Sequence, residues 1–148
     1  MTEVAFHFNA PDKLEYACRL LRKAVANAAQ IVVAGVSHLL NALDSALWSF
    51  FPNSFIPHCT WQASEETLSF SPVVLVMADE LPDTLPHHHV LLNLGHELLK
   101  GFEAFERIIE IVTHDEHDKA FARKRWKHYA DRGYPLQRHD VGAKLVTA

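Results

Sequence analysis

Apolar positions recur every second residue in some parts of the chain and every third or fourth residue in others. Residues 3–8 and 107–113 alternate apolar and polar side chains, which is typical of strands. Residues 30–35 and 72–78 are almost wholly apolar and rich in valine, which favours strands buried on both faces. The predicted strands are 3–8, 30–35, 72–78, 89–94 and 107–113.

Three segments instead show the helical period. The predicted helices are 13–29, 38–50 and 115–132, and a short turn-rich or helical piece is expected at 98–105. Strands and helices alternate along the chain, and no internal repeat or low-complexity linker interrupts them. We therefore predict an α/β protein whose central sheet carries helices on both faces.

The last helix has clear start and stop signals. No glycine or proline occurs from 115 to 132, and Gly133 follows as a helix terminator. Thr113 or Asp115 can cap the amino end, where the helix dipole favours negative charge.

Charge makes this helix unusual. Residues 119–134 hold six of the fourteen basic residues and one acid, Asp131, so the segment carries +5 in a chain whose net charge is −4. Lys119, Arg123 and Lys127 follow each other at intervals of four residues, and Trp126 borders that row. Such a face can bind a carboxylate together with an apolar side chain, or it can simply be solvated with Trp126 in the core.

Composition limits the remaining possibilities. The 148 residues suit one domain spanning the whole chain, with 143–148 as a flexible tail. A pI near 6.2 argues against general binding of nucleic acid by the whole surface. Two cysteines without a metal or disulfide pattern, no signal peptide and no long apolar run indicate a cytoplasmic protein without a membrane segment.

Catalytic chemistry finds little support. Residues 73–80 resemble a Walker B strand, but no glycine-rich loop with lysine is present to hold phosphates. Eleven histidines include a triplet at 87–89, yet consecutive residues of a strand point to opposite faces and do not converge on one metal ion. We expect no catalytic residues, no cofactor and no metal.

An aromatic run precedes the second half of the chain. Nine residues of this run contain Trp48, Phe50, Phe51, Phe55 and Ile56, and two prolines, Pro52 and Pro57, interrupt it. Such a loop either covers the core or forms an exposed patch that binds a partner.

Two segments, LDSALWSFFPNSFIPH at 43–58 and ARKRWKHYADRGYPL at 122–136, together resemble the two signatures of a known family, the chi subunit of bacterial DNA polymerase III holoenzyme. Residues 43–58 match its pattern Leu-Asp-x-Ala-Leu-Trp followed by Ser-Phe-hydrophobic-Pro-His. Residues 122–136 match Ala-Arg-x-Arg-aromatic-Lys-x-Tyr followed by Gly-aromatic. The resemblance implies a three-layer α/β/α fold, Rossmann-like with a mostly parallel or mixed sheet, but without a phosphate-binding loop.

The resemblance also implies a function. The family has no catalytic activity and links the clamp-loader complex, through the psi subunit, to the acidic C-terminal tail of single-stranded DNA-binding protein, so contact with DNA is indirect. The implied tail site comprises Lys119, Arg123, Trp126 and Lys127, and the implied psi site comprises Trp48, Phe55, Ile56 and Pro57. The alternative hypothesis is direct binding of single-stranded nucleic acid by the basic helix.

Overall fold

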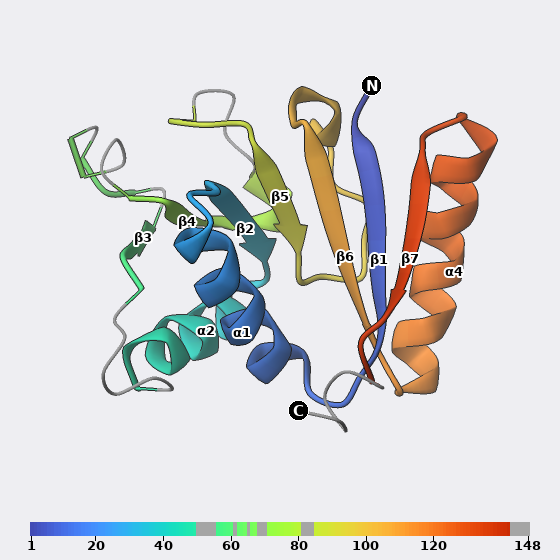
Figure 1. Ribbon diagram of the computed structural model, residues 1–148, viewed down its shortest axis with the longest axis horizontal. Helices are drawn as coiled ribbons and strands as arrows, with labels where there is room; N and C mark the ends of the chain where they lie inside the picture. Colours follow the sequence, from blue (N-terminus) through green and yellow to red (C-terminus); the bar gives the residue numbers. More distant parts are fainter. Residues whose placement is uncertain (50–55, 61, 65, 68–70, 81–84, 143–148) are drawn as a thin grey trace.

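Seven strands form one sheet, in the spatial order β3-β4-β2-β5-β6-β1-β7 (Figure 1). The computed structural model describes residues 1–49, 56–60, 62–64, 66–67, 71–80 and 85–142. Every neighbouring pair of described strands is parallel, so the sheet is more uniform than the predicted mostly parallel or mixed arrangement. The strands are β1 (Glu3–Ala10), β2 (Ile31–Gly35), β3 (His58–Thr60), β4 (Val73–Met77), β5 (Val90–Asn93), β6 (Arg107–Thr113) and β7 (Leu136–Asp140).

The described helices match the three predicted segments closely. They are α1 (Lys13–Ala26), α2 (Ser37–Ser49) and α4 (Glu116–Asp131), with two short 3₁₀ turns, η1 (Ala78–Glu80) and η2 (Phe102–Ala104). Helix α1 ends three residues before the predicted 29 because Asn27 caps it and Ala28 takes a left-handed φ of 62°. Asp115 caps α4, its side chain accepting a hydrogen bond from the Asp118 backbone N–H.

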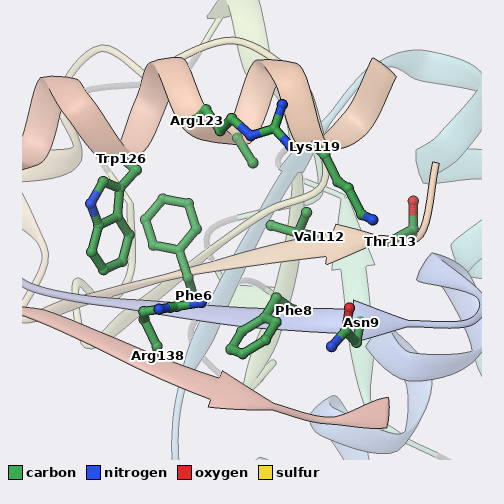
Figure 2. Close-up of a pocket in the computed structure, with 10 residues that line it drawn as sticks. Phe6, Phe8, Asn9, Val112, Thr113, Lys119, Arg123, Trp126 and Arg138 are labelled. Carbon is green, nitrogen blue, oxygen red and sulfur yellow. The ribbon is translucent and has the colours of Figure 1, made fainter. Parts of the chain in front are cut away.

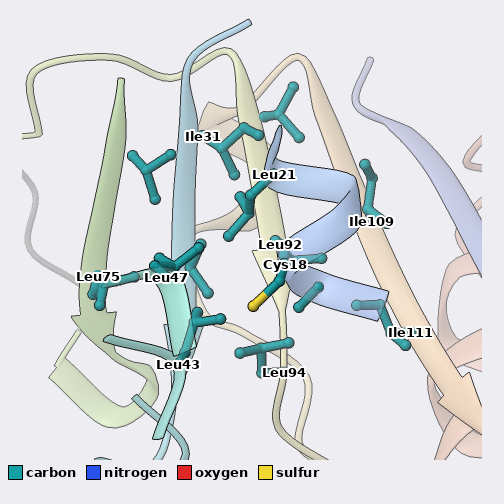
Figure 3. Packing of buried hydrophobic residues seen from close by; sticks show 14 of the residues in the cluster. Cys18, Leu21, Ile31, Leu43, Leu47, Leu75, Leu92, Leu94, Ile109 and Ile111 are labelled. Carbon is teal, nitrogen blue, oxygen red and sulfur yellow. The ribbon is translucent and has the colours of Figure 1, made fainter. Parts of the chain in front are cut away.

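One face of the sheet is covered by α1 and α2. Cys18 and Leu21 of α1 and Leu43 and Leu47 of α2 are completely buried against this face (Figure 3). The sheet contributes the apolar side chains of alternate positions, among them Ile31, Leu75, Leu92, Leu94, Ile109 and Ile111. Burial of about ten such side chains supplies the main driving force for this layer.

The opposite face is covered by α4 and by the segment around η2. Ala122 and Tyr129 of α4 join Phe102 in a second buried cluster with the other side chains of β1, β2, β4, β5 and β6. Figure 1 shows α4 beside the β6-β1-β7 half of the sheet and α1 next to α2; α2 contacts β2 and β4, and α1 contacts β6. The fold is therefore the three-layer α/β/α arrangement that the resemblance implied.

Two edge strands were missing from the predicted set. β3 is only three residues long, and β7 has the polar sequence LQRHD, so neither shows a clear apolar alternation. β7 nevertheless pairs with β1 along five residues, from Val4 with Leu136 to Phe8 with Asp140. The expected flexible tail at 143–148 lies outside the described residues.

A buried ion pair joins α4 to the sheet. Arg125 Nε donates to Glu110 Oε2 of β6 at 2.8 Å, and the two side chains are 2% and 0% exposed. Tyr129 Oη donates to the same oxygen at 3.1 Å, and Arg125 Nη1 donates to the backbone oxygen of His96 at 2.7 Å. Burial raises the pKa of Glu110, although the Arg125 guanidinium opposes that shift. Burial also raises the pKa of the Tyr129 hydroxyl, which stays a hydrogen-bond donor.

We expect Arg125→Met to lower the free energy of unfolding by about 3–5 kcal/mol, because Glu110 would remain buried without its counter-ion. The double variant Glu110→Gln/Arg125→Met removes that charge and keeps an acceptor for Tyr129, so it should recover much of the loss. Chemical denaturation of both variants measures the difference. A double variant no more stable than Arg125→Met would contradict this account.

Candidate functional site

A groove of about 480 Å³ lies between α4 and the β6-β1-β7 end of the sheet. Figure 2 shows side chains of α4 along one wall and side chains of β1 and β7 along the other. The lining residues are Phe6, Phe8, Asn9, Val112, Thr113, Lys119, Ala122, Arg123, Trp126 and Arg138.

The helical wall contains three of the four residues expected in a tail site. Lys119, Arg123 and Trp126 all line the groove, because positions i, i+4 and i+7 share one helix face. Lys127 is exposed on α4 and does not line the groove. Lys127 follows Lys119 by eight residues and is therefore rotated about 80° around the helix axis from Lys119. The predicted row of basic residues thus turns away from the groove.

The wall of the groove that the sheet forms is lined by aromatic rings. The rings of Phe6 and Trp126 meet edge to face, with centroids 5.1 Å apart, so Trp126 is held against β1. Phe8 follows two residues along the same strand and also lines the groove. Asn9 then takes a left-handed φ of 66° at an irregularity in the β1-β6 pairing, and its side chain closes this end of the groove.

Positive charge faces the groove from both walls. Lys119 lies 3.6 Å from the exposed carboxylate of Glu116. Neither Arg123 nor Arg138 forms an ion pair with any acid in the described part of the chain. The Arg138 guanidinium carbon lies 4.9 Å from the centroid of the Phe8 ring, which orients this cation over that ring. Phe8 and Trp126 are half-buried, and cations beside partly accessible aromatic rings can hold carboxylates and an apolar side chain together.

A second polar cluster fixes the amino end of α4 to the sheet. The buried carboxylate of Asp118 accepts from the backbone N–H and hydroxyl of Thr113 at 2.8 and 3.0 Å. Lys13 Nζ donates to its other oxygen at 3.1 Å, and His96 Nε2 lies 3.2 Å from the same atom. Burial alone would raise the pKa of Asp118, but hydrogen bonds from Thr113 and the Lys13 ammonium outweigh it and lower that pKa.

The residues expected in the psi site do not share one environment in the structure. Trp48 is 63% exposed on α2 and Pro57 is exposed, whereas Ile56 is 3% exposed and belongs to the buried core. Phe55 lies outside the described residues. Trp48 packs edge to face on His58, whose Nε2 lies 2.7 Å from Asp44 Oδ1. Asp44, Trp48 and His58 are the Asp, Trp and His of the motif at 43–58.

The histidine triplet takes separate structural positions. His87 is buried, and burial lowers its pKa, while His88 packs against Phe105 and His89 lies 3.7 Å from Glu106. Within the described ranges, no three His, Cys, Asp or Glu side chains converge as metal ligands would. The described helices also include none that is long and apolar enough to cross a membrane.

Phe6, Phe8 and Arg138 are among the groove residues that sequence reasoning did not predict as site residues. The alternation at Val4, Phe6 and Phe8 indicated a strand, but nothing in it showed that α4 packs over this strand. Arg138 had no signal, because the strand that carries it was not predicted.

Comparison with known proteins adds an independent result. The sequence model of the family described as "DNA polymerase III chi subunit, HolC" matches residues 1–137. DNA polymerase III subunit chi of Pseudomonas aeruginosa is 32% identical over 144 residues, which cover 94% of this chain and 96% of that protein. The Haemophilus influenzae protein of the same name is 30% identical over 100 residues, covering 68% of this chain and 67% of that protein.

Asp118→Asn should destabilise the fold by about 1–3 kcal/mol at pH 7, because the Asp118 carboxylate accepts hydrogen bonds from Thr113 and Lys13. A folded-state pKa below the ordinary value of about 4 gives stability that is present above pH 4 and lost as pH falls through the folded-state pKa. The difference between wild type and variant should therefore shrink between about pH 5 and pH 2. Denaturation at several pH values measures it, with the exposed Asp131→Asn as control. A stability difference that stays constant over this pH range would contradict a stabilising negative charge on Asp118.

Proposed function

The chain belongs to the DNA polymerase III chi subunit family, which makes it an accessory subunit of replication, and from this premise we propose that it is a non-catalytic adaptor. In this proposal one surface binds the acidic C-terminal tail of single-stranded DNA-binding protein. A second surface binds the psi subunit, or its equivalent, of the clamp-loader complex.

The groove between α4 and β1 is the proposed tail site. The observation that carries this proposal is the Arg123 guanidinium, which has no acidic partner in the described part of the chain and stands beside the Phe6-Trp126 pair. A peptide that ends in phenylalanine presents a ring and a carboxylate a few ångströms apart. We propose that the ring packs on Trp126 and Phe6, that Arg123 binds the terminal carboxylate, and that Lys119 faces acids further upstream.

The alternative ligand, single-stranded nucleic acid, fits this groove less well. Lys119, Arg123 and Arg138 line the groove, while the chain as a whole carries −4. A long polyanion would have to continue past the groove and would be repelled by this net negative charge, whereas a short peptide would end inside the groove. Lys127, exposed next to the groove, extends the attraction to a peptide as it approaches.

The second proposed surface is centred on Trp48. An indole that is 63% exposed is unusual for a surface helix and resembles the aromatic anchors of protein interfaces. Its contact with His58, which is itself next to Asp44, holds the ring in one orientation. Pro57 is also exposed, and its neighbour Ile56 is buried in the core. We propose that these residues, together with Phe55, meet the psi subunit.

Arg123→Ala should weaken binding of an acidic peptide ending in phenylalanine by about 2 kcal/mol or more, roughly 30-fold in Kd, because a charge-assisted contact is lost. Calorimetry with the full chain measures it. Lys124→Ala removes one charge from the opposite face of the same helix and should leave Kd within about twofold. Equal losses in both variants would mean that only the net charge of the helix matters.

The same titration with a single-stranded oligonucleotide tests the alternative. Micromolar binding without any partner protein, falling steeply as salt is raised, would favour direct nucleic-acid binding. Binding of the peptide but not of the oligonucleotide is the outcome expected for an adaptor.

Trp48→Ala should weaken binding to the psi subunit by about 2 kcal/mol, which is typical of an interface tryptophan. Binding of the tail peptide should be unchanged, because Trp48 is on α2 and contributes nothing to the groove. Circular dichroism checks that the variant is folded. Unchanged psi affinity in a folded variant would place the second interface elsewhere.

A further inference from the structure

We infer that His58 is a positioning residue of the second proposed surface, and that its doubly protonated ring, an imidazolium, holds Trp48 in the orientation that a partner subunit meets. Affinity for that partner therefore falls as pH rises. This inference rests on the proposed function of Trp48 and adds a charge state and a pH dependence to it.

Both nitrogens of the His58 ring lie against hydrogen-bond acceptors. Nε2 is 2.7 Å from Oδ1 of Asp44, and Nδ1 is 2.7 Å from the backbone oxygen of Ile56. A backbone carbonyl and a carboxylate can only accept, so each contact needs a hydrogen on the ring nitrogen. A neutral imidazole carries one such hydrogen, whereas the imidazolium carries two. The two contacts together therefore require a positively charged ring.

The surroundings of His58 suit this charge. Asp44 of α2 places a carboxylate directly against the ring, and the two side chains are 46% and 1% exposed. On β4, the residue paired with His58 is Val73, which is buried and apolar. Cys59 follows on β3 and points to the other face of the sheet, because neighbouring strand residues alternate. An imidazolium that water hardly reaches depends on its two acceptors for stabilisation.

The same ring also contacts Trp48. Asp44 and Trp48 are four residues apart on α2, so the carboxylate and the indole share one face of that helix. The rings of His58 and Trp48 meet edge to face, with centroids 5.7 Å apart. A cation within about 6 Å of an indole centroid is attracted by its π electrons. Because Ile56 belongs to the buried core, His58 connects the exposed indole to the core.

Loss of the second proton breaks this connection. A neutral His58 ring can donate to Asp44 or to Ile56 but not to both, so one of the two oxygens would face a nitrogen lone pair. The cation–π attraction to Trp48 is lost at the same time. The contacts are complete at pH values where His58 is charged, and they are lost as pH rises through its titration in the folded protein.

Nuclear magnetic resonance of the full chain, with isotope-labelled histidine, measures the charge without any partner. Both ring nitrogens of His58 should give imidazolium signals at about pH 6 and change together as pH is raised to about 9. The indole N–H signal of Trp48 should shift in step with them. Spectra of His58→Gln and Trp48→Phe assign the signals. A singly protonated His58 ring at pH 6, or an indole signal that does not follow it, would overturn the inference alone.

Calorimetry with the psi subunit then tests the effect on affinity. His58→Gln should bind about fivefold more weakly than wild type at about pH 6 and equally at about pH 9. The ratio of the two Kd values cancels any titration of the psi subunit itself. Asp44→Asn keeps an acceptor but removes the negative charge, so its affinity should fall at lower pH than that of wild type. His38→Gln removes an exposed histidine of the same helix and should match wild type.

The tail peptide provides a further control, with circular dichroism to check each variant for folding. The described residues that line the groove include no histidine, so Kd for the peptide should be the same at both pH values. A ratio of psi affinities that stays constant between these pH values would overturn the inference and leave the proposed function in place. If wild type bound the psi subunit at neither pH, the second proposed surface would fail together with the inference.

Discussion

The buried pair between Glu110 and Arg125 determines what α4 can present to the outside. Arg125 is fixed on the sheet by Glu110, and Tyr129, one turn later, donates to the same carboxylate. With these two positions facing inward, Lys119, Arg123 and Trp126 must face β1 and β7. Such a pair adds little net stability, since burying both charges costs about what their attraction returns. A rotation of the helix that separated the two would be strongly unfavourable, so the pair fixes the orientation of the groove.

The Asp118 cluster has a comparable role at the carboxyl end of the strands. Ligands of parallel α/β folds usually bind at this edge, often through phosphates on helix N-termini. Here the carboxylate of Asp118 accepts the Thr113 N–H and pairs with Lys13, and Asp115 caps the helix. Both acids occupy positions where a phosphate would bring its negative charge. The groove lies instead on the face of the sheet that α4 covers, between α4 and the β6-β1-β7 end.

Half of the groove could be predicted from the sequence, and the reason is physical. Charge and helical period are local properties, so Lys119, Arg123 and Trp126 could be assigned to one face from their spacing alone. The fourth predicted residue, Lys127, does not line the groove, because positions four apart drift around the helix. The other wall depends on which strands pair with which. Phe6 and Arg138 are 132 positions apart, and only the β1-β7 pairing, through a polar edge strand, brings them opposite each other.

The distribution of ion pairs shows how a chain with a net negative charge can still present cations in one groove. Lys13, Arg19, Arg107 and Arg125 each have an acid of the same chain within 3.3 Å. The paired acid neutralises most of each positive charge, and salt screens the remaining field beyond about 10 Å. Arg123 and Arg138 have no such acid among the described residues, and both face one aromatic groove. The positive charge of these two arginines lies where apolar contacts are also available, which favours a ligand that combines carboxylates with a ring over one that offers charge alone.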